Sequence, residues 1–180
     1  MLFEFMTAGF GGQGILYLGD VLAGAALREG RNATFLPTYG AAMRGGTANC
    51  VVIISDKAIG AMTLDQPHAA VLMNQPSFEK FQAVLRPGGL IVANTSLVDP
   101  SSLRRTDLRV VWIPATQISK DVVGTERSAN IVALGALLKA EPIVETATIE
   151  AIFRDGATGK RRAMLDKNLA ALRAGLDFQD

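Results

Sequence analysis

The sequence predicts an α/β fold of three layers, in which helices cover both faces of a mostly parallel sheet, with a mixed sheet as the alternative. Short apolar runs bounded by turn residues alternate with segments whose apolar residues recur at helical spacing. The first run passes through a glycine-rich turn, residues 8–14, directly into a helical segment, which is typical of Rossmann-like domains. A chain of 180 residues suits one domain, so we expect residues 1–180 to form a single unit.

Charge and composition exclude several classes of partner. The chain has 18 Lys and Arg against 17 Asp and Glu, a net charge of +1, which favours neither nucleic acid nor an anionic membrane. No apolar segment reaches the roughly 18 residues of a membrane-spanning helix, and Glu4 interrupts the first apolar run, so we expect a cytoplasmic protein. Cys50 is the only cysteine, which excludes an internal disulfide and an iron–sulfur cluster held by this chain alone.

The first half of the chain predicts three strands and one helix. Residues 2–7 form the first strand, and the helix begins at Ile15 and ends at Gly30. Residues 32–36 and 48–54 form the second and third strands. Only about ten residues separate these two strands, whereas a parallel crossover normally takes a dozen or more. The second and third strands are therefore candidates for antiparallel pairing.

The second half predicts three more strands and four helices. The strands are expected at residues 68–73, 90–93 and 109–113. The helices are expected at 77–85 with Ser77 as N-cap, at 129–139 with Ser128 as N-cap, around 149–153, and at 165–176. Leucines recur along one side of the last helix, which indicates a core or interface face.

The glycine turn is the main candidate binding site. Gly9, Gly11 and Gly14 follow the dinucleotide spacing G-x-G-x-x-G, and Gly12 and Gln13 complete the turn. Such a turn gathers backbone N–H groups at the positive end of a helix dipole, where an anion such as phosphate is favoured. An acidic residue that would hold a ribose is expected at the end of the second strand, but residues 34–36 are Thr, Phe and Leu. This absence disfavours NAD.

A second glycine-rich segment, residues 38–47, carries Arg44, Gly45 and Gly46. Glycines at this density are unusual in a short loop unless the backbone must approach something closely. Two interpretations stay open: a flexible turn with a solvated arginine, or an anion or interface anchor beside the first glycine turn. Asn74 and Asn94 end two predicted strands, where they either line a ligand crevice or serve as ordinary turn residues.

The remaining reactive side chains favour structural roles. His68 is the sole histidine, so it has no histidine or second cysteine partner for a metal site. Cys50 lies in an apolar strand and is expected to be a small buried residue. The basic residues at 160–162 are balanced by nearby acids and are expected to form a solvated helix start. The chain therefore predicts a binding and shaping role more than catalysis of its own.

Several motifs together resemble the gamma subunit of 2-oxoacid:ferredoxin oxidoreductases. The resemblance is carried by Gly-Phe-Gly-Gly-Gln-Gly at 9–14 and by the segment 37–50, which contains Met-Arg-Gly-Gly-Thr. Residues 53–56, 72–77 and 128–136 agree with it in the same order, so it covers most of the chain. Ala42 departs from the family pattern, which often has an acidic residue there.

The resemblance implies a subunit of an enzyme that oxidatively decarboxylates a 2-oxoacid to its acyl-coenzyme A and passes electrons to ferredoxin. It implies alpha-type and beta-type partner subunits with thiamine diphosphate between them, and iron–sulfur clusters on other chains, in a hetero-oligomer that includes a ferredoxin-like subunit or ferredoxin. It also associates coenzyme A with this chain. We expect the binding residues to be Gly9, Gly11, Gly12, Gln13, Gly14, Arg44, Gly45, Gly46 and Asn74. A stand-alone nucleotide-binding protein and a purely structural subunit are the alternatives. Among substrates, 2-oxoglutarate and a branched-chain oxoacid are preferred over pyruvate and indolepyruvate.

Overall fold

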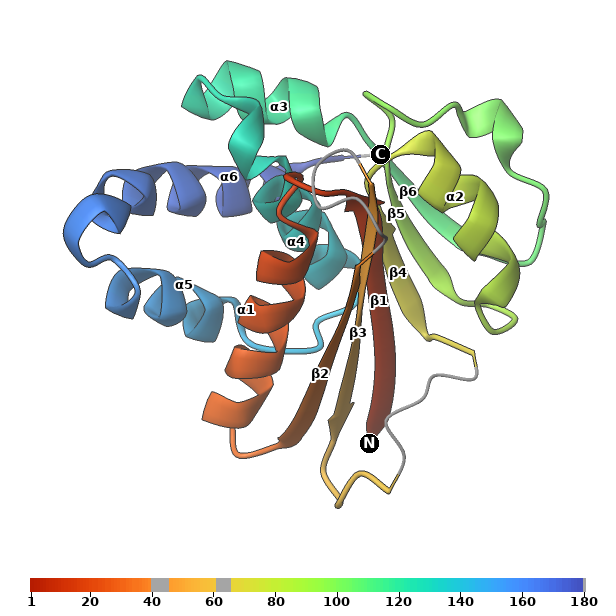
Figure 1. Ribbon diagram of the computed structural model, residues 1–180, viewed down its shortest axis with the longest axis horizontal. Helices are drawn as coiled ribbons and strands as arrows, with labels where there is room; N and C mark the ends of the chain where they lie inside the picture. The colour runs from red at the N-terminus through yellow and green to blue at the C-terminus, as the bar shows by residue number, and fades with distance from the viewer. Residues whose placement is uncertain (40–45, 61–65, 180) are drawn as a thin grey trace.

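The computed structural model describes residues 1–39, 46–60 and 66–179, and these build one sheet of six strands in the order β2-β3-β1-β4-β5-β6 (Figure 1). The strands are β1 (Leu2–Phe10), β2 (Asn32–Tyr39), β3 (Thr47–Ser55), β4 (Ala69–Leu72), β5 (Leu90–Asn94) and β6 (Arg109–Ile113). Every predicted strand is therefore present. The α/β class is confirmed.

The sheet is mixed because β3 alone opposes the other strands. β2 and β3 form an antiparallel ladder, and β3 in turn pairs antiparallel with β1, so β2 runs in the same direction as β1. β1, β4, β5 and β6 are parallel neighbours. The short connection between β2 and β3 predicted their antiparallel pairing, because antiparallel strands need no crossover helix between them.

Helices cover both faces of this sheet, unequally. Most of them lie on one face, to the left of the sheet in Figure 1, whereas α2 (Gln75–Phe81) lies on the other. The larger layer comprises α1 (Ile15–Arg28), α3 (Ala115–Val123), α4 (Ala129–Ala140), α5 (Thr146–Asp155) and α6 (Leu165–Asp177). The fold is thus three-layered, as the sequence predicts.

Among the described residues, two apolar cores fill the spaces between the layers. Side chains alternate across each strand, so Phe5 of β1 points to the larger helix layer and Met6 to the α2 side. The larger core joins β1 and β3 to α1 and α4, and the smaller centres on Phe78 of α2, which is fully buried. Both faces of β4 and β5 are buried, which explains why their sequences are continuously apolar.

α4 and α6 approach each other unusually closely through two glycines. A Cβ added at Gly135 would lie 2.9 Å from the Gly175 Cα, and one added at Gly175 would lie 2.9 Å from the Ala136 nitrogen. The backbones can therefore meet only because neither position carries a side chain. The leucine side of the last helix accordingly packs in the core, where Leu172 is fully buried.

Several predicted boundaries and caps are wrong. β1 continues to Phe10 because it pairs with β3 as far as Phe10 opposite Thr47, so Gly9 belongs to the strand. α2 begins at Gln75 and is capped by Asn74, whose Oδ1 accepts from the Ser77 nitrogen at 2.9 Å; Ser77 is not the cap. Ser128 is the N-cap residue of α4 as predicted, but its side chain makes no capping hydrogen bond.

α3 is a helix that the sequence did not predict. Its residues, Ala-Thr-Gln-Ile-Ser-Lys-Asp-Val-Val, are mostly polar and carry only a short apolar side. Its N-cap is Pro114, which offers no capping side chain. The cap comes from β5, since the Asn94 Oδ1 accepts from the Thr116 nitrogen at 3.2 Å. A local pattern does not reveal a cap that is supplied about twenty residues earlier in the chain.

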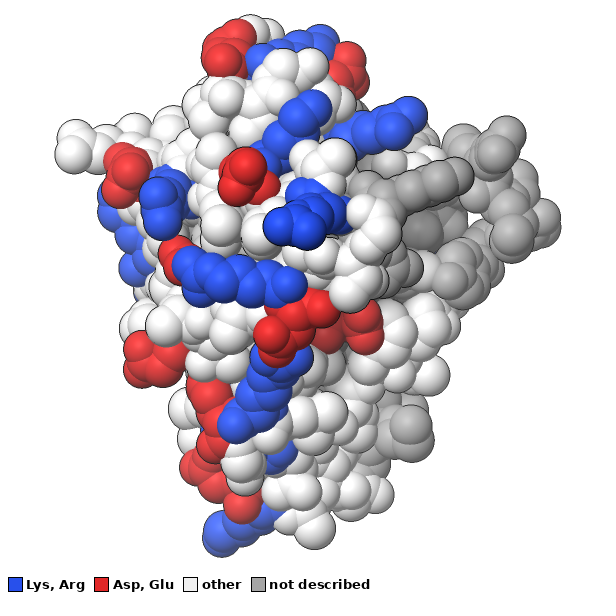
Figure 2. Space-filling view, turned by 90° about the vertical axis from the view of Figure 1, so that its left-hand side faces the viewer, with Lys and Arg blue, Asp and Glu red and all other residues white. Residues whose placement is uncertain are grey.

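The surface of the larger helix layer carries both signs of charge. Figure 2 shows basic and acidic side chains interspersed over this face. Some form ion pairs, such as Arg154 with Glu150 at 2.6 Å within α5. In the described ranges, no helix is both long enough and apolar enough to cross a membrane.

Candidate functional site at the glycine turn

The turn after β1 carries the candidate site. Gly14 is the N-cap of α1 and has φ +73°, a left-handed conformation that favours glycine. Its carbonyl accepts from the Leu18 nitrogen at 3.0 Å and so begins the helix. The first-turn amides of α1 point out of the helix end without intrahelical partners. They provide partial positive charge at the carboxyl edge of the parallel strands.

Gln13 holds the turn closed with its own side chain. Its Oε1 accepts from the Phe10 nitrogen at 2.6 Å, and its Nε2 donates to the Met73 carbonyl at 3.3 Å. The Gln13 nitrogen donates to the Phe10 carbonyl at 3.1 Å. Gln13 therefore fixes the shape of the turn and ties β1 to the end of β4.

Gly9 and Gly11 serve the close packing around this turn. A Cβ at Gly9 would lie 2.6 Å from the Gln13 Oε1 and 2.7 Å from the Ile15 Cδ1, so glycine makes room for the Gln13 side chain. The Gly11 nitrogen donates to the Gly46 carbonyl at 2.9 Å, which joins the two glycine-rich segments. The structure thus brings Gly46 to the turn, whereas Arg44 and Gly45 lie outside the described residues.

Asn74 and Asn94 are both engaged within the fold. Asn74 is 1% exposed, caps α2, and donates from Nδ2 to the Gln13 Oε1 at 3.4 Å. Asn94 donates to the Met73 carbonyl at 3.3 Å and to the Thr116 Oγ1 at 2.9 Å. These amides form a connected network across the ends of β1, β4 and β5. The network stiffens the edge on which the glycine turn sits.

Asn130 is a site residue to which the sequence reasoning gave no role. It lies in the first turn of α4, is 3% exposed, and donates from Nδ2 to the Gly14 carbonyl at 3.0 Å. A Cβ at Gly14 would lie 2.7 Å from the Asn130 Cγ, so glycine is required for this approach. The available signal was its polarity, because almost every other residue of α4 is apolar.

Cys50 and His68 lie away from this chemistry. Burial, followed by the negative charge of Asp20, raises the pKa of Cys50 to about 12, so the thiol stays protonated at neutral pH. Its predicted burial is confirmed.

His68 lies next to the opposite end of β1, where its Nδ1 accepts from the Glu4 nitrogen at 3.2 Å. The same Nδ1 is 3.6 Å from the Glu4 carboxylate, a distance that would suit an ion pair if the ring were protonated. Nδ1 cannot both accept a hydrogen bond and carry a proton. Burial and then Arg86 lower the pKa of His68, with Glu141 opposing them, and the neutral ring is the form that fits.

The fold and this turn define an α/β domain that presents backbone donors at the carboxyl edge of a largely parallel sheet. Within that class, the chain belongs to the pyruvate ferredoxin/flavodoxin oxidoreductase family, whose model matches residues 4–178. The resemblance read from the glycine motifs is confirmed at the level of the family and of its gamma-type subunit.

Individual relatives agree with this assignment. A ketoisovalerate oxidoreductase subunit VorA from Methanothermobacter marburgensis is 39% identical over 175 residues, which cover 95% of this chain and 35% of VorA. The chain thus spans about a third of the VorA subunits that it matches. The gamma subunit of a keto/oxoacid ferredoxin oxidoreductase from Geobacter sulfurreducens is 29% identical, with a TM-score of 0.83 over 97% of this chain and 96% of that one.

A third relative contains the same domain within a longer chain. The 2-oxoglutarate:ferredoxin oxidoreductase from Magnetococcus marinus, solved with 2-oxoglutarate, coenzyme A and succinyl-CoA bound, is 27% identical with a TM-score of 0.86. The match covers 97% of this chain and 30% of that one. The domain therefore occurs among its relatives both as nearly a whole chain and as part of a larger one.

Proposed function

We propose that this chain is the gamma-type subunit of a thiamine-diphosphate-dependent 2-oxoacid:ferredoxin oxidoreductase, which decarboxylates a 2-oxoacid oxidatively to its acyl-CoA. The observation that carries the proposal is the family match over residues 4–178, together with a gamma-subunit structure that superimposes on 97% of the chain. Alpha-type and beta-type subunits hold thiamine diphosphate, and iron–sulfur clusters lie on partner chains. The protein is a cytoplasmic hetero-oligomer, and its 2-oxoacid is 2-oxoglutarate or a branched-chain oxoacid.

The proposed contribution of this chain is to bind coenzyme A at the glycine turn. The first-turn amides of α1 and the turn formed by Gly12 and Gly14 would receive the phosphates. Gly11 and Gly46 join the two glycine-rich segments through their 2.9 Å hydrogen bond, and Arg44 precedes Gly46 by only two residues in the sequence. Gly9, Gln13 and Asn74 hold the turn in shape. The hydrogen-bonded turn supports a phosphate site, and the sequence position of Arg44 makes it the proposed cation.

Purification tests the subunit role. The chain should be isolated anaerobically from its native cells under gentle conditions, with mass spectrometry of the associated proteins and an absorbance spectrum. Thiamine-dependent partners that elute with the chain, and the broad visible band of iron–sulfur clusters, are the expected result. A colourless, solitary chain would contradict the proposal and would favour a stand-alone nucleotide-binding protein.

The coenzyme A role is tested by Arg44→Ala in the complex. We expect the KM for coenzyme A to rise by more than the KM for the 2-oxoacid, because the arginine is proposed to bind only the former. Arg173→Ala is the matched control, since Arg173 is an exposed α6 residue whose side chain is 65% accessible. An equal rise in both KM values would count against the role.

A purely structural subunit is the second candidate, and one observation favours it. The turn amides of Gly11 and Gln13 are already engaged by the Gly46 and Phe10 carbonyls, so part of the donor set is used by the fold itself. If Gly12→Ala and Arg44→Ala both leave the affinity of the complex for coenzyme A unchanged, the glycine segments serve packing alone.

A further inference from the structure

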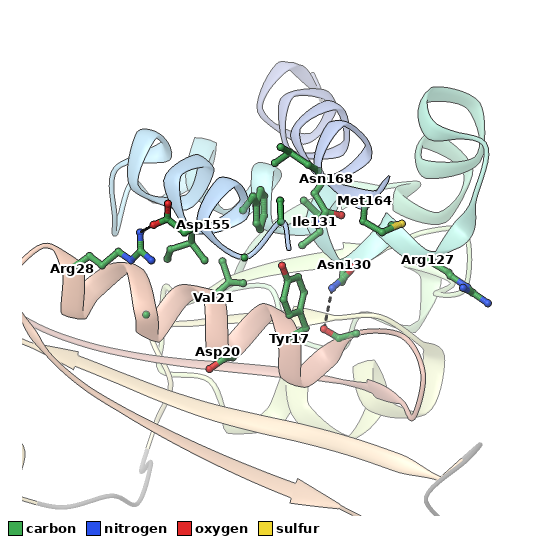
Figure 3. A pocket seen from close by; sticks show the side chains of 17 residues that line it. Tyr17, Asp20, Val21, Arg28, Arg127, Asn130, Ile131, Asp155, Met164 and Asn168 are labelled. Atoms are coloured by element: carbon green, nitrogen blue, oxygen red, sulfur yellow. Dashed lines mark hydrogen bonds and ion pairs between the residues drawn. The ribbon is translucent and has the colours of Figure 1, made fainter. Parts of the chain in front are cut away.

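A cleft of about 730 Å³ opens beside the glycine turn on the larger helix layer. It is bordered by α1, α4, α5 and the start of α6, and Asn130, which is hydrogen-bonded to Gly14, lies at one end of it (Figure 3). Its volume falls within the roughly 300–1,000 Å³ of small-molecule sites. The arrangement of side chains around it indicates what it could hold.

The Gly14 end of the cleft contains a buried acceptor. Asn130 uses its Nδ2 to donate to the Gly14 carbonyl at 3.0 Å. Its Oδ1 is buried, and within the described ranges it has no hydrogen-bond partner. Buried amide oxygens are nearly always paired in folded proteins. A ligand that brings an N–H donor to this end would satisfy Asn130 without disturbing its bond to the turn.

The wall of the cleft is aromatic and apolar. Tyr17 stacks on Phe153 with ring centroids 6.5 Å apart and an interplanar angle of 18°. Tyr17 is 43% exposed, and Val21 and Ile131 extend the apolar surface beside it. Such a wall suits a flat ring, because stacking on an aromatic side chain requires only a planar π-system.

Apart from Asp20 of α1, the charged side chains that line the cleft lie at its two ends. Arg28 and Asp155 pair at 2.6 Å at the end away from the turn, so that end is electrically balanced. Arg127 is exposed and lies at the same end as Asn130 in Figure 3. The first-turn amides of α1 lie at this end as well. An anionic substituent on the ring would therefore be favoured toward the turn.

We infer that this cleft holds the adenine ring of coenzyme A, with the ring amine donating to the Asn130 Oδ1, Tyr17 as the stacking surface, and the ribose phosphate toward Arg127. The inference rests on the proposed coenzyme A role and extends it. The backbone turn binds the pyrophosphate, and the side chains of the cleft recognise the nucleoside. A planar ring, an amine donor and phosphates are the three features that the cleft and turn match.

Binding of coenzyme A fragments to the purified complex tests the inference. Adenosine 3′,5′-bisphosphate, pantetheine and intact coenzyme A are titrated by calorimetry. We expect the bisphosphate to bind and to compete with coenzyme A. Tyr17→Leu should weaken bisphosphate binding about tenfold, whereas Tyr17→Phe should retain it, because the ring and not the hydroxyl carries the stacking. The inference is wrong if coenzyme A binds while Tyr17→Leu leaves the bisphosphate affinity unchanged.

Arg127→Ala provides a second variant that does not touch the core. We expect it to lower the affinity for the bisphosphate and to leave the affinity for adenosine unaltered, since in the proposed pose only the phosphates face the arginine. If pantetheine competes with coenzyme A and the bisphosphate does not, the cleft is not the nucleoside site, although the coenzyme A role stands. If the complex binds no coenzyme A at all, the proposed role fails as well, so the two failures are distinguishable.

Discussion

Gly14→Ala is the substitution whose cost the structure defines best. Gly14 has φ +73°, and this backbone conformation costs an L-residue about 1–2 kcal/mol of stability. Alanine also lowers the entropy of the unfolded chain, which offsets part of this cost. The added Cβ would also meet the Asn130 amide, with the Cγ at 2.7 Å. The displaced amide would lose its bond to the Gly14 carbonyl and leave buried polar atoms unpaired, which costs about 1–3 kcal/mol. We expect a total destabilisation of about 3 kcal/mol.

Gly30→Ala is the matched control. Gly30 has φ +76°, nearly the same as Gly14, but an added Cβ would meet no atom within 4 Å. Only the cost of the left-handed backbone conformation remains, so we expect the free energy of unfolding to fall by about 1 kcal/mol. Urea denaturation of both variants, followed by circular dichroism, gives the comparison. Equal losses in Gly14→Ala and Gly30→Ala would refute the argument that Asn130 restricts Gly14.

A double-mutant cycle isolates the same contact. In an Asn130→Ala background the obstructing amide is absent, so Gly14→Ala should cost only about 1 kcal/mol, as it does at Gly30. The coupling free energy between the two sites should then be about 2 kcal/mol. Additive losses would mean that the 3.0 Å hydrogen bond between Asn130 and Gly14 does not fix the turn.

Three further predictions use the same measurement. Gly175→Ala should lower the free energy of unfolding by about 3 kcal/mol, because its Cβ would overlap a carbonyl oxygen of α4. In Gly24→Ala the nearest atom to the added Cβ lies at 3.7 Å, so this substitution should raise the free energy of unfolding by up to about 1 kcal/mol. Asn74→Ala should lower the free energy of unfolding by about 1 kcal/mol because it removes the N-cap of α2, and Ser77→Ala should lower it by less than about half of that. A larger loss in Ser77→Ala than in Asn74→Ala would mean that Ser77 is the cap. Because burial lowers the pKa of His68 below 6.5, the unfolded chain binds the proton more readily, so stability should fall as the pH drops below 6.5. His68→Gln should flatten this slope, and an unchanged slope would contradict the assignment.

The architecture could be predicted because it depends on patterns that are local in sequence. Continuous apolar runs gave β4 and β5, and the short connection after β2 indicated the antiparallel β3. Predictions failed where a partner comes from far along the chain. The cap of α3 comes from Asn94, and the C-terminal end of β1 is set by its pairing with β3. Distant hydrogen bonds leave little trace in a local pattern.

The sequence predicts the position of the glycine turn before α1, but not the hydrogen bonds within it. The glycine motif predicts a set of donors for an anion, but part of it serves packing, since Gly9 makes room for the Gln13 side chain. The motif predicts Gln13 as a ligand contact, and in the structure its side-chain amide closes the turn. Asn130 touches the turn from a helix more than a hundred residues later, so its polarity marks it in the sequence but only the fold shows its contact with Gly14.

The separation between backbone and side-chain contacts makes the two proposals independently measurable. Phosphate donors at the turn belong to the main chain of α1, so substitution of a side chain in the cleft leaves them in position. Nucleoside contacts belong to side chains, Tyr17 above all, which stacks on Phe153 and not on the turn. Tyr17→Leu should therefore reduce the affinity for adenosine-containing fragments while inorganic pyrophosphate binds as before. Asn130 is the exception, because it touches both the turn and the cleft, and its substitution should weaken both classes of ligand together.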